Sequence, residues 1–313
     1  MLDAEMRRRW RVGVRSLARR PHPYRTSFPL EDLDVVLEDG RRLQLVFKDL
    51  RFEGLEDGAK LAKASWVHDS FREIEAYRLL AEADLGTPKL YASLADPKTG
   101  RYWLFIERID GVPLWQVGER QVWEAAAVWL AGLHRRFLGV VRAPSSSLCA
   151  YDMGRSMPAL RRAIQHASGR ARHILERIGA GYENVVHRLQ CLPHTLVHGD
   201  FYASNILVDR SRTPTRIAAA DWEMAGIGPG LLDLASLVSG TWSATDRSAM
   251  VTAYANAAIG GPPKSQFLAD LEGCMLHNAI QFLEVSPAWA PPPGQTHDWL
   301  AEAYSAAAEL GIL

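Results

Sequence analysis

The sequence predicts an α+β protein of two lobes, with an antiparallel sheet and one main helix in the first lobe and a larger, mainly helical second lobe. Apolar and polar residues alternate along several short segments before residue 109, which is typical of strands packed on one face. Beyond Gly111-Val112-Pro113 the apolar residues recur at helical spacing in stretches rich in alanine and leucine. We therefore expect the lobes to be residues 1–109 and 110–313.

The first lobe begins with a predicted hairpin. Leu33, Val35 and Leu37 alternate with polar residues, Asp39-Gly40 supplies a tight turn, and alternation resumes up to Lys48. The other elements expected in this lobe are an amphipathic helix over 71–80 and strands over 89–93 and 102–108.

The arginine-rich stretch from Arg7 to Arg20 precedes this hairpin. A transit peptide or a membrane-surface helix would be arginine-rich, but Asp3 and Glu5 lie just before it. We expect a solvated, partly helical N-terminus.

The second lobe is expected to consist of helices interrupted by one loop and one short hairpin. The loop follows 195–197, and strands over 206–208 and 217–220 flank a polar turn. Gly226-Ile227-Gly228-Pro229-Gly230 lacks dinucleotide-loop spacing and is predicted to be a turn. The expected helices are 123–137, 157–178, 183–189 and, apart from breaks at 262–263 and 287–294, the chain from Leu231 onward.

Composition narrows the class of protein. Lys+Arg and Asp+Glu both number 36, so no net charge favours binding to nucleic acid or to an anionic membrane. The three cysteines are far apart and show neither zinc-ligand spacing nor a disulfide framework. Because no apolar run is long enough to span a membrane and no signal peptide is evident, a cytoplasmic location is expected.

One stretch carries most of the chemical information. His198-Gly199-Asp200 is followed by Asn205 and, after the predicted hairpin, by Asp221-Trp222-Glu223. Phosphoryl transfer requires a carboxylate that accepts the proton of the attacking hydroxyl and oxygen ligands that hold Mg²⁺. Asp200, Asn205 and Asp221 supply these groups, although each residue alone is more commonly a turn-capping residue.

This pattern resembles the aminoglycoside phosphotransferase and choline kinase-like branch of the protein-kinase-like superfamily. The residues that carry the resemblance are HGDFYASNIL, the later ADWE, and the segment from Gly228 through Asp233-Leu234-Ala235. The resemblance implies a bilobal protein-kinase-like fold and transfer of the γ-phosphoryl group of ATP, with Mg²⁺, to a hydroxyl of a small molecule.

The same resemblance implies roles for individual residues. Asp200 corresponds to the catalytic-loop aspartate, Asn205 to the metal-binding asparagine, and Asp221 to the aspartate that replaces that of the kinase DFG motif. His198 would brace the loop. Asp233 resembles the structural aspartate that tethers this loop, and His134 is expected to be a satisfied core histidine.

In the first lobe, Lys48 corresponds to the lysine that contacts the α- and β-phosphates. Its partner is expected to be a glutamate of the following helix, and the alignment favours Glu73 over Glu75. Taken alone, each of these residues would be interpreted as a solvated surface charge.

The remaining nucleotide contacts are expected in two segments. The stretch that contains Glu107 and Ile109 resembles the linker between lobes, whose backbone groups would bind adenine. The phosphate loop lacks a glycine-rich motif, so Thr26 and Ser27 are the candidates there, through backbone amides and hydroxyls.

Several alternatives stay open at this point. A nucleotide-binding pseudokinase or a nucleotidyltransferase could have the same fold, and GTP could replace ATP. The acceptor could be an aminoglycoside, an amino alcohol, a sugar or a natural product. The C-terminal helices expected to bind it contain scattered acidic and aromatic residues without a dense acidic patch. The sequence does not predict the oligomeric state.

Overall fold

The computed structural model describes the chain except for residues 24–26, 56–68, 140–147, 149, 152 and 286–295, and it divides into two compact units. Unit 1 comprises Met1–Val112 and Leu207–Met224, and unit 2 comprises Pro113–Ile206 and Ala225–Leu313. The α+β fold class is confirmed, with an antiparallel N-terminal sheet and a helical C-terminal part. In the described part of the chain, no helix is both long and apolar enough to span a membrane.

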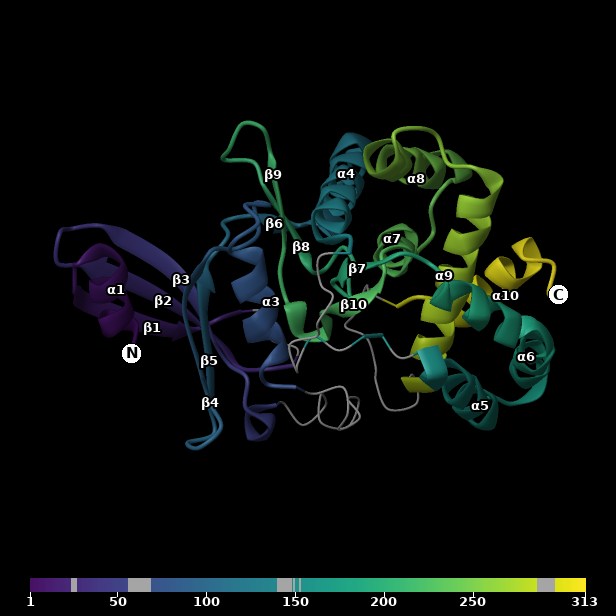
Figure 1. The fold of residues 1–313 in the computed structure, drawn as a ribbon, viewed down its shortest axis with the longest axis horizontal. Helices are drawn as coiled ribbons and strands as arrows, with labels where there is room; N and C mark the ends of the chain where they lie inside the picture. Colours follow the sequence, from purple (N-terminus) through teal and green to yellow (C-terminus); the bar gives the residue numbers. More distant parts are fainter. Residues whose placement is uncertain (24–26, 56–68, 140–147, 149, 152, 286–295) are drawn as a thin grey trace. The chain divides into compact units, whose positions relative to one another are not determined.

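Unit 1 is built around a five-stranded sheet with strand order β1-β2-β3-β5-β4. In Figure 1 its elements are purple and blue, apart from the green β8, β9 and η4. These elements are α1 (Leu2–Trp10), β1 (Val14–Pro21), β2 (Leu30–Leu37), β3 (Arg42–Asp49), η1 (Phe52–Gly54), α3 (Arg72–Leu80), β4 (Leu90–Asp96), β5 (Arg101–Glu107), β6 (Val112–Pro113), β8 (Ile206–Asp209), β9 (Arg216–Ala219) and η4 (Trp222–Met224).

The register of this sheet determines where Lys48 points. The β2–β3 hairpin is confirmed, and β3 pairs antiparallel with β5 so that Lys48 lies opposite Leu104. Side chains alternate between the two faces of a strand. Leu45 and Phe47 belong to the apolar cluster that includes Leu2 and Met6 of α1, so Lys48 points to the opposite face.

The N-terminal segment differs from the prediction. Arg7 to Arg20 is not simply a solvated, partly helical stretch, because β1 extends from Val14 to Pro21 as an edge strand of the sheet. Nearly every residue of β1 is exposed, which removes the alternation that would have revealed it. Two of its arginines, Arg19 and Arg20, are instead paired with acids of β2, as in Arg19 with Glu31 at 2.5 Å.

Unit 2 is mainly helical. Its elements are η2 (Leu114–Gln116), α4 (Arg120–Phe137), η3 (Met153–Arg155), α5 (Ser156–His166), α6 (Gly169–Gln190), β7 (His194–Val197), β10 (Gly226–Pro229), α7 (Leu231–Val238), α8 (Ala244–Ile259), α9 (Ser265–Val285) and α10 (Trp299–Glu309).

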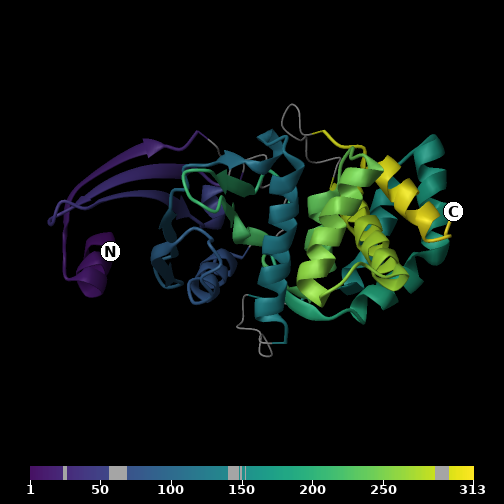
Figure 2. The same ribbon diagram turned by 90° about the horizontal axis from the view of Figure 1, so that it is seen from above.

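Helix α9 is the central element of this unit, since it contacts α5, α6, α7 and α10, while α4 packs against α8 (Figures 1 and 2). Buried residues occur around much of α9, as expected for a helix surrounded by others. Helix α4 instead buries one stripe at helical spacing, formed by Trp123, Ala127, Leu130, His134 and Phe137.

Two sequence predictions in unit 2 are wrong in detail. The helices predicted over 157–178 and 183–189 are divided differently, because the break falls before Gly169, whose φ of 53° is left-handed, and α6 then continues to Gln190. The predicted turn Gly226 to Gly230 contains strand β10, whose Gly226–Pro229 pairs antiparallel with β7. The predicted break at 287–294 lies outside the described residues.

Candidate functional site: an ion-pair site in unit 1 and a braced loop in unit 2

Lys48 is the centre of a buried ion-pair cluster in unit 1. Its side chain is only 6% exposed, and its Nζ lies 2.7 Å from Oε2 of Glu73 on α3 and 2.5 Å from Oδ1 of Asp221. The structure therefore brings together three of the predicted site residues, and it pairs Lys48 with Glu73, the glutamate favoured by the alignment.

The charges in this cluster depend on one another. Burial lowers the pKa of Lys48, but the attraction of Asp221, Glu73 and Glu223 outweighs it, so the net result is a pKa well above the ordinary value. Burial raises the pKa of Glu73 to about 7, against the opposing effect of Lys48. Glu73 is 2% exposed and Asp221 28%, so Asp221 is the carboxylate of this pair that faces solvent.

The segment after β9 holds Asp221 in an unusual conformation. Asp221 has a φ of 65°, in the left-handed region that non-glycine residues rarely adopt. On its C-terminal side the indole of Trp222 is fully buried, with Nε1 donating to the carbonyl of Ala219 at 3.1 Å. Strain of this kind persists only where neighbouring contacts enforce it, and it is concentrated at functional positions.

Glu223 fixes the other side of the same segment. The hydroxyl of Ser27 donates to its carboxylate at 3.2 Å, and Nη1 of Arg72 donates to its carbonyl at 3.2 Å. Ser27, a predicted phosphate-loop residue, is buried and is held beside the Asp221 segment in this way. Thr26, the other predicted residue of that loop, lies outside the described residues.

In the segment predicted to bind adenine, Glu107 and Ile109 differ in what their polar groups bind. The Glu107 carboxylate is engaged by both terminal nitrogens of Arg216, at 2.9 and 2.8 Å. Burial disfavours the charge of Glu107, yet its bonds with Arg216 lower its pKa overall. The Glu107 side chain is therefore structural, whereas the backbone N–H and C=O of Ile109 have no hydrogen-bond partner among the described residues.

In unit 2, the predicted catalytic loop is attached to α7 through one carboxylate. Asp233 is fully buried, and its two oxygens accept the backbone N–H groups of His198 at 2.7 Å and Gly199 at 2.9 Å. Gly199 has a φ of 80°, a conformation that favours glycine. His198 is also fully buried, and its Nδ1 accepts the N–H of Asp200 at 3.3 Å, so it braces the loop.

A second layer of hydrogen bonds supports Asp233. Nε2 of His134 lies 3.2 Å from the Asp233 carboxylate, and its Nδ1 lies 2.8 Å from the hydroxyl of Tyr254 on α8. Because a carboxylate only accepts, the His134 nitrogen that faces Asp233, Nε2, carries a proton. A side chain at Gly230 would lie 2.7 Å from this ring nitrogen, so glycine is required there. His134 is the satisfied core histidine that the sequence predicts.

Within the loop, Asn205 orients Asp200. The Asn205 amide donates to the backbone carbonyl of Asp200 and to its carboxylate Oδ2, both at 2.9 Å. The N–H of Tyr202 donates to the same carbonyl at 2.8 Å. Burial raises the pKa of Tyr202, and the carboxylates of Asp200 and Glu302 add to that increase.

The predicted ligands Asn205 and Asp221 carry the type of ligand atoms that magnesium prefers. Among the described residues, no three His, Cys, Asp or Glu side chains are grouped to hold a metal. The predicted ligands are instead an amide oxygen and a carboxylate, the hard oxygen donors that Mg²⁺ binds together with substrate phosphates and water. Because the Asn205 nitrogen makes both bonds to Asp200, its oxygen stays available as a ligand.

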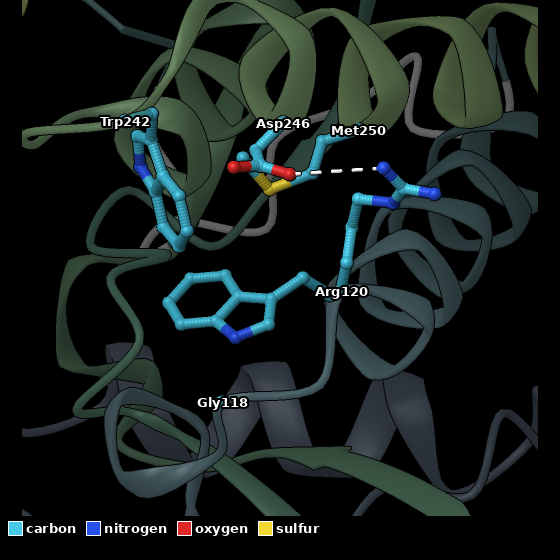
Figure 3. Close-up of a pocket in the computed structure, with 6 residues that line it drawn as sticks. Gly118, Arg120, Trp242, Asp246 and Met250 are labelled. Carbon is cyan, nitrogen blue, oxygen red and sulfur yellow. Dashed lines mark ion pairs between the residues drawn. The ribbon is translucent and has the colours of Figure 1, made fainter.

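A separate open cavity of about 80 Å³ lies in unit 2, between the start of α4 and the start of α8 (Figure 3). The rings of Trp123 and Trp242 pack edge to face there at 4.5 Å, and Arg120 lies 3.8 Å from Asp246. None of the predicted site residues lines this cavity, whose lining residues are Gly118, Arg120, Trp123, Trp242, Asp246 and Met250.

Comparison with known proteins identifies the family. The model of the phosphotransferase enzyme family matches residues 32–268, a span that contains Lys48, Asp200 and Asp221. The chain belongs to this phosphotransferase family. It is therefore a kinase-like enzyme that phosphorylates hydroxyl groups of small molecules. No curated protein matches the sequence.

Solved structures of other phosphotransferases share the fold. A microcompartment-associated aminopropanol kinase is 15% identical with a TM-score of 0.63, covering 94% of this chain and 90% of that one. Choline kinase from Cryptosporidium parvum is 14% identical with a TM-score of 0.58, covering 95% and 91%. A putative aminoglycoside phosphotransferase from Ralstonia eutropha is 17% identical with a TM-score of 0.58, covering 99% and 95%.

Some contacts that shape the site of this phosphotransferase were not predicted from the sequence. Arg216 and Tyr254 gave no local signal, because their partners Glu107 and His134 are 109 and 120 positions away. Glu223 could have been found, since it belongs to the ADWE stretch that carried the family resemblance.

Proposed function

We propose that this phosphotransferase transfers the γ-phosphoryl group of ATP to a hydroxyl of a small molecule, with Asp200 as the catalytic base. The observation that carries the proposal is the buried Lys48 held by Glu73 and Asp221 in unit 1 of a chain with this family motif. A lysine held in this way presents a fixed positive charge, as the binding of nucleotide phosphates requires. One structural neighbour is a choline kinase that was solved in complex with AMP, which supports an adenine nucleotide as co-substrate.

In this proposal, residues 1–109 supply most of the nucleotide contacts. Lys48 binds the α- and β-phosphates, and Glu73 keeps its ammonium group in place. Thr26 and Ser27 contribute to the phosphate loop, and the backbone around Glu107 and Ile109 binds adenine. The available backbone groups of Ile109 support that last assignment.

Residues 110–313 supply the base and, in this proposal, the acceptor-binding surface. Asp200 accepts the proton of the acceptor hydroxyl while its oxygen attacks the γ-phosphorus, and ADP leaves. The bonds from Asn205 keep the Asp200 carboxylate oriented, and His198 and Asp233 keep the loop rigid. Asn205 and Asp221 would hold Mg²⁺, which when bound neutralises charge on the phosphate oxygens.

Calorimetric titration with ATP, with and without Mg²⁺, tests the nucleotide site. We expect metal-dependent binding that Asp221→Asn weakens, while the exposed turn variant Asp39→Asn leaves it unchanged. Absence of ATP binding by the unmodified chain would point to a pseudoenzyme or to an enzyme that binds its acceptor first.

A screen of hydroxyl acceptors for ADP release tests the reaction. Asp200→Asn is expected to retain ATP affinity and to lose transfer by roughly 10² to 10⁴-fold, the usual contribution of a general base. Release of pyrophosphate in place of ADP would show nucleotidyl transfer. A loss of ATP affinity in Asp200→Asn as large as that of Asp221→Asn would contradict the role of Asp200 as the base.

A further inference from the structure

A small cavity lies at the N-terminal ends of α4 and α8, which pack side by side in unit 2 (Figure 3). Trp123 and Met250 form its buried floor and are 7% and 1% exposed. Trp242, Arg120 and Asp246 form its rim, where the arginine and aspartate side chains are 48% and 40% exposed. None of the residues proposed for catalysis or for nucleotide binding lines the cavity.

The two tryptophans of the cavity have their polar groups bound within the protein. Nε1 of Trp123 donates to the carbonyl of Val117 at 2.7 Å, and Nε1 of Trp242 donates to that of Ser239 at 3.1 Å. The two rings meet edge to face at 4.5 Å with an interplanar angle of 73°, so they form a corner. What they offer to a ligand is therefore apolar area and electron-rich ring faces, which attract cations.

The carboxylate of Asp246 is only partly used by the protein. Its Oδ2 accepts the hydroxyl of Ser243, the residue that caps α8, at 2.6 Å. Its Oδ1 lies 3.8 Å from Nη1 of Arg120, beyond hydrogen-bond distance, and accepts no hydrogen bond from the described residues. Arg120 has a closer partner in Glu124, at 3.0 Å on the same helix. The charge of Asp246 is thus available to a second cation that comes closer than Arg120 does.

The size and the lining of the cavity narrow the class of ligand. A cavity of about 150 Å³ takes a benzene ring, so one of about 80 Å³ takes a group of only a few heavy atoms. Met250 adds a polarizable apolar surface that suits methyl groups. An anion would face the Asp246 carboxylate, and Glu124 offsets the charge of the arginine that could attract it.

We propose that this cavity binds a small organic cation, of the size of a methylated ammonium group, with the Asp246 carboxylate as its counterion and the rings of Trp123 and Trp242 as its apolar wall. A cation of this kind matches a lining of one carboxylate, two indoles and one thioether. The proposal goes beyond phosphoryl transfer, because it adds a second ligand site whose residues take no part in that reaction. Binding there needs neither ATP nor an acceptor hydroxyl.

Tetramethylammonium and tert-butanol test the inference, because they have similar shapes and only the first is charged. The indole N–H signals of the full chain are followed by heteronuclear NMR, and those of Trp123 and Trp242 are assigned from the variants Trp123→Phe and Trp242→Phe. Sodium chloride keeps the ionic strength constant. We expect saturable shifts of both signals with tetramethylammonium and none with tert-butanol at equal concentration. Because tetramethylammonium has no hydroxyl, it is not a phosphoryl acceptor.

Variants of the rim give the sign of the charge that binds. Asp246→Asn removes the counterion and is expected to weaken binding about three- to fivefold, as for a partly exposed ion pair. Asparagine can still accept the Ser243 hydroxyl, so the start of α8 is retained. The exposed turn variant Asp39→Asn is the matched control and should leave the affinity unchanged. Arg120→Gln removes the competing cation and is expected to strengthen binding about twofold.

Trp242 provides a test of the aromatic wall. Trp242→Leu is expected to weaken the binding of tetramethylammonium, and Trp242→Phe, which retains a ring, to restore most of it. The shifts are then read from the Trp123 signal, which both variants keep.

Four results would overturn the inference: no saturable shift of either indole signal, equal shifts with tert-butanol, an unchanged affinity in Asp246→Asn, or a lower affinity in Arg120→Gln. Shifts confined to other tryptophans would place the cation at a different site and would count equally against the cavity. Failure of the proposed function is recognised separately, because it shows in the magnesium-dependent binding of ATP and in the nature of the released product.

Discussion

At the scale of single residues, several buried charges and titratable groups have neighbours that compensate for them. Lys48 is held by two carboxylates, and Asp233 accepts two backbone N–H groups as well as contacting His134. His277 of α9 is a further case. Its Nδ1 lies 3.0 Å from the hydroxyl of Tyr182 and 3.4 Å from that of Ser156, so the buried ring is accommodated in its neutral form.

His277 predicts a pH dependence of stability. Burial lowers its pKa to about 4, below the value of about 6.5 in an unfolded chain. Between these values the unfolded state binds more protons, so the free energy of unfolding is expected to decrease as the pH falls from about 6.5 to about 4. The loss from this residue is about 3 kcal/mol.

Urea unfolding at a series of pH values measures this contribution. His277→Gln keeps a polar side chain but does not titrate, so its stability should change less over that interval than that of the unmodified chain. The exposed His166→Gln serves as the matched control and should leave the profile unchanged. An identical profile for His277→Gln and the unmodified chain would show that His277 is not the source.

At the scale of elements, the sequence predicted most helices and strands. It missed two strands that lack an alternation of buried and exposed residues and are defined by their pairing with a neighbouring strand. The hairpin of β2 and β3 and the helix α3 follow from alternation and helical spacing. Strand β1 could not be found in that way, since its residues are exposed on both faces and its Arg19 and Arg20 are paired with acids of β2. Strand β10 was hidden by its glycines and proline, and only its pairing with β7 defines it.

The packing of α4 on α8 gives a prediction for one pair of tryptophans. Trp123 is 7% exposed, its Nε1 donates to the carbonyl of Val117 at 2.7 Å, and its ring packs against Trp242. Trp123→Ala should lower the free energy of unfolding by about 3 to 5 kcal/mol, because it opens a cavity in a packed contact.

The matched control is Trp115→Ala, since Trp115 of η2 is 46% exposed. We expect that change to stay within about 0.5 kcal/mol in the same denaturant titration. Equal destabilisation by the two substitutions would show that the α4–α8 contact does not determine the stability of unit 2.

At the scale of the whole molecule, the chain forms unit 1 from two separated segments. Residues 1–112 contain Lys48 and Glu107, while their partners Asp221 and Arg216 are supplied by residues 207–224. Cutting the chain after Val112 therefore removes one carboxylate from Lys48 and both Arg216 donors from the Glu107 carboxylate, which keeps only the backbone N–H of Lys89 among the donors of the described residues.

This arrangement predicts that a fragment of residues 1–112 is unstable. We expect no cooperative unfolding transition for it by circular dichroism in urea, because unpaired buried charges are costly. A fragment in which a glycine-rich linker joins 1–112 to 207–224 should regain a cooperative transition. If the shorter fragment unfolded as cooperatively as the joined one, the second segment would be dispensable for unit 1.

The sequence by itself determined the contents of the catalytic loop, because the groups that act there are close along the chain. His198 and Asn205 contact Asp200 over two and five positions, respectively, so these contacts are local, and the roles expected of the three residues came from the motif that resembles the family. The family resemblance extended this to Lys48, Glu73 and Asp221 as individual residues.

Only the tertiary structure decided which distant groups satisfy one another. Asp221 reaches Lys48 across 173 positions, and Trp299 reaches Tyr202 from another helix. Local propensity carries no information on such pairings, since they arise when buried charges and rings find compensating partners during packing. The hydrogen bonds that link Glu302 to His297 and Ser239 are likewise a result of packing, although His297 lies only five positions away.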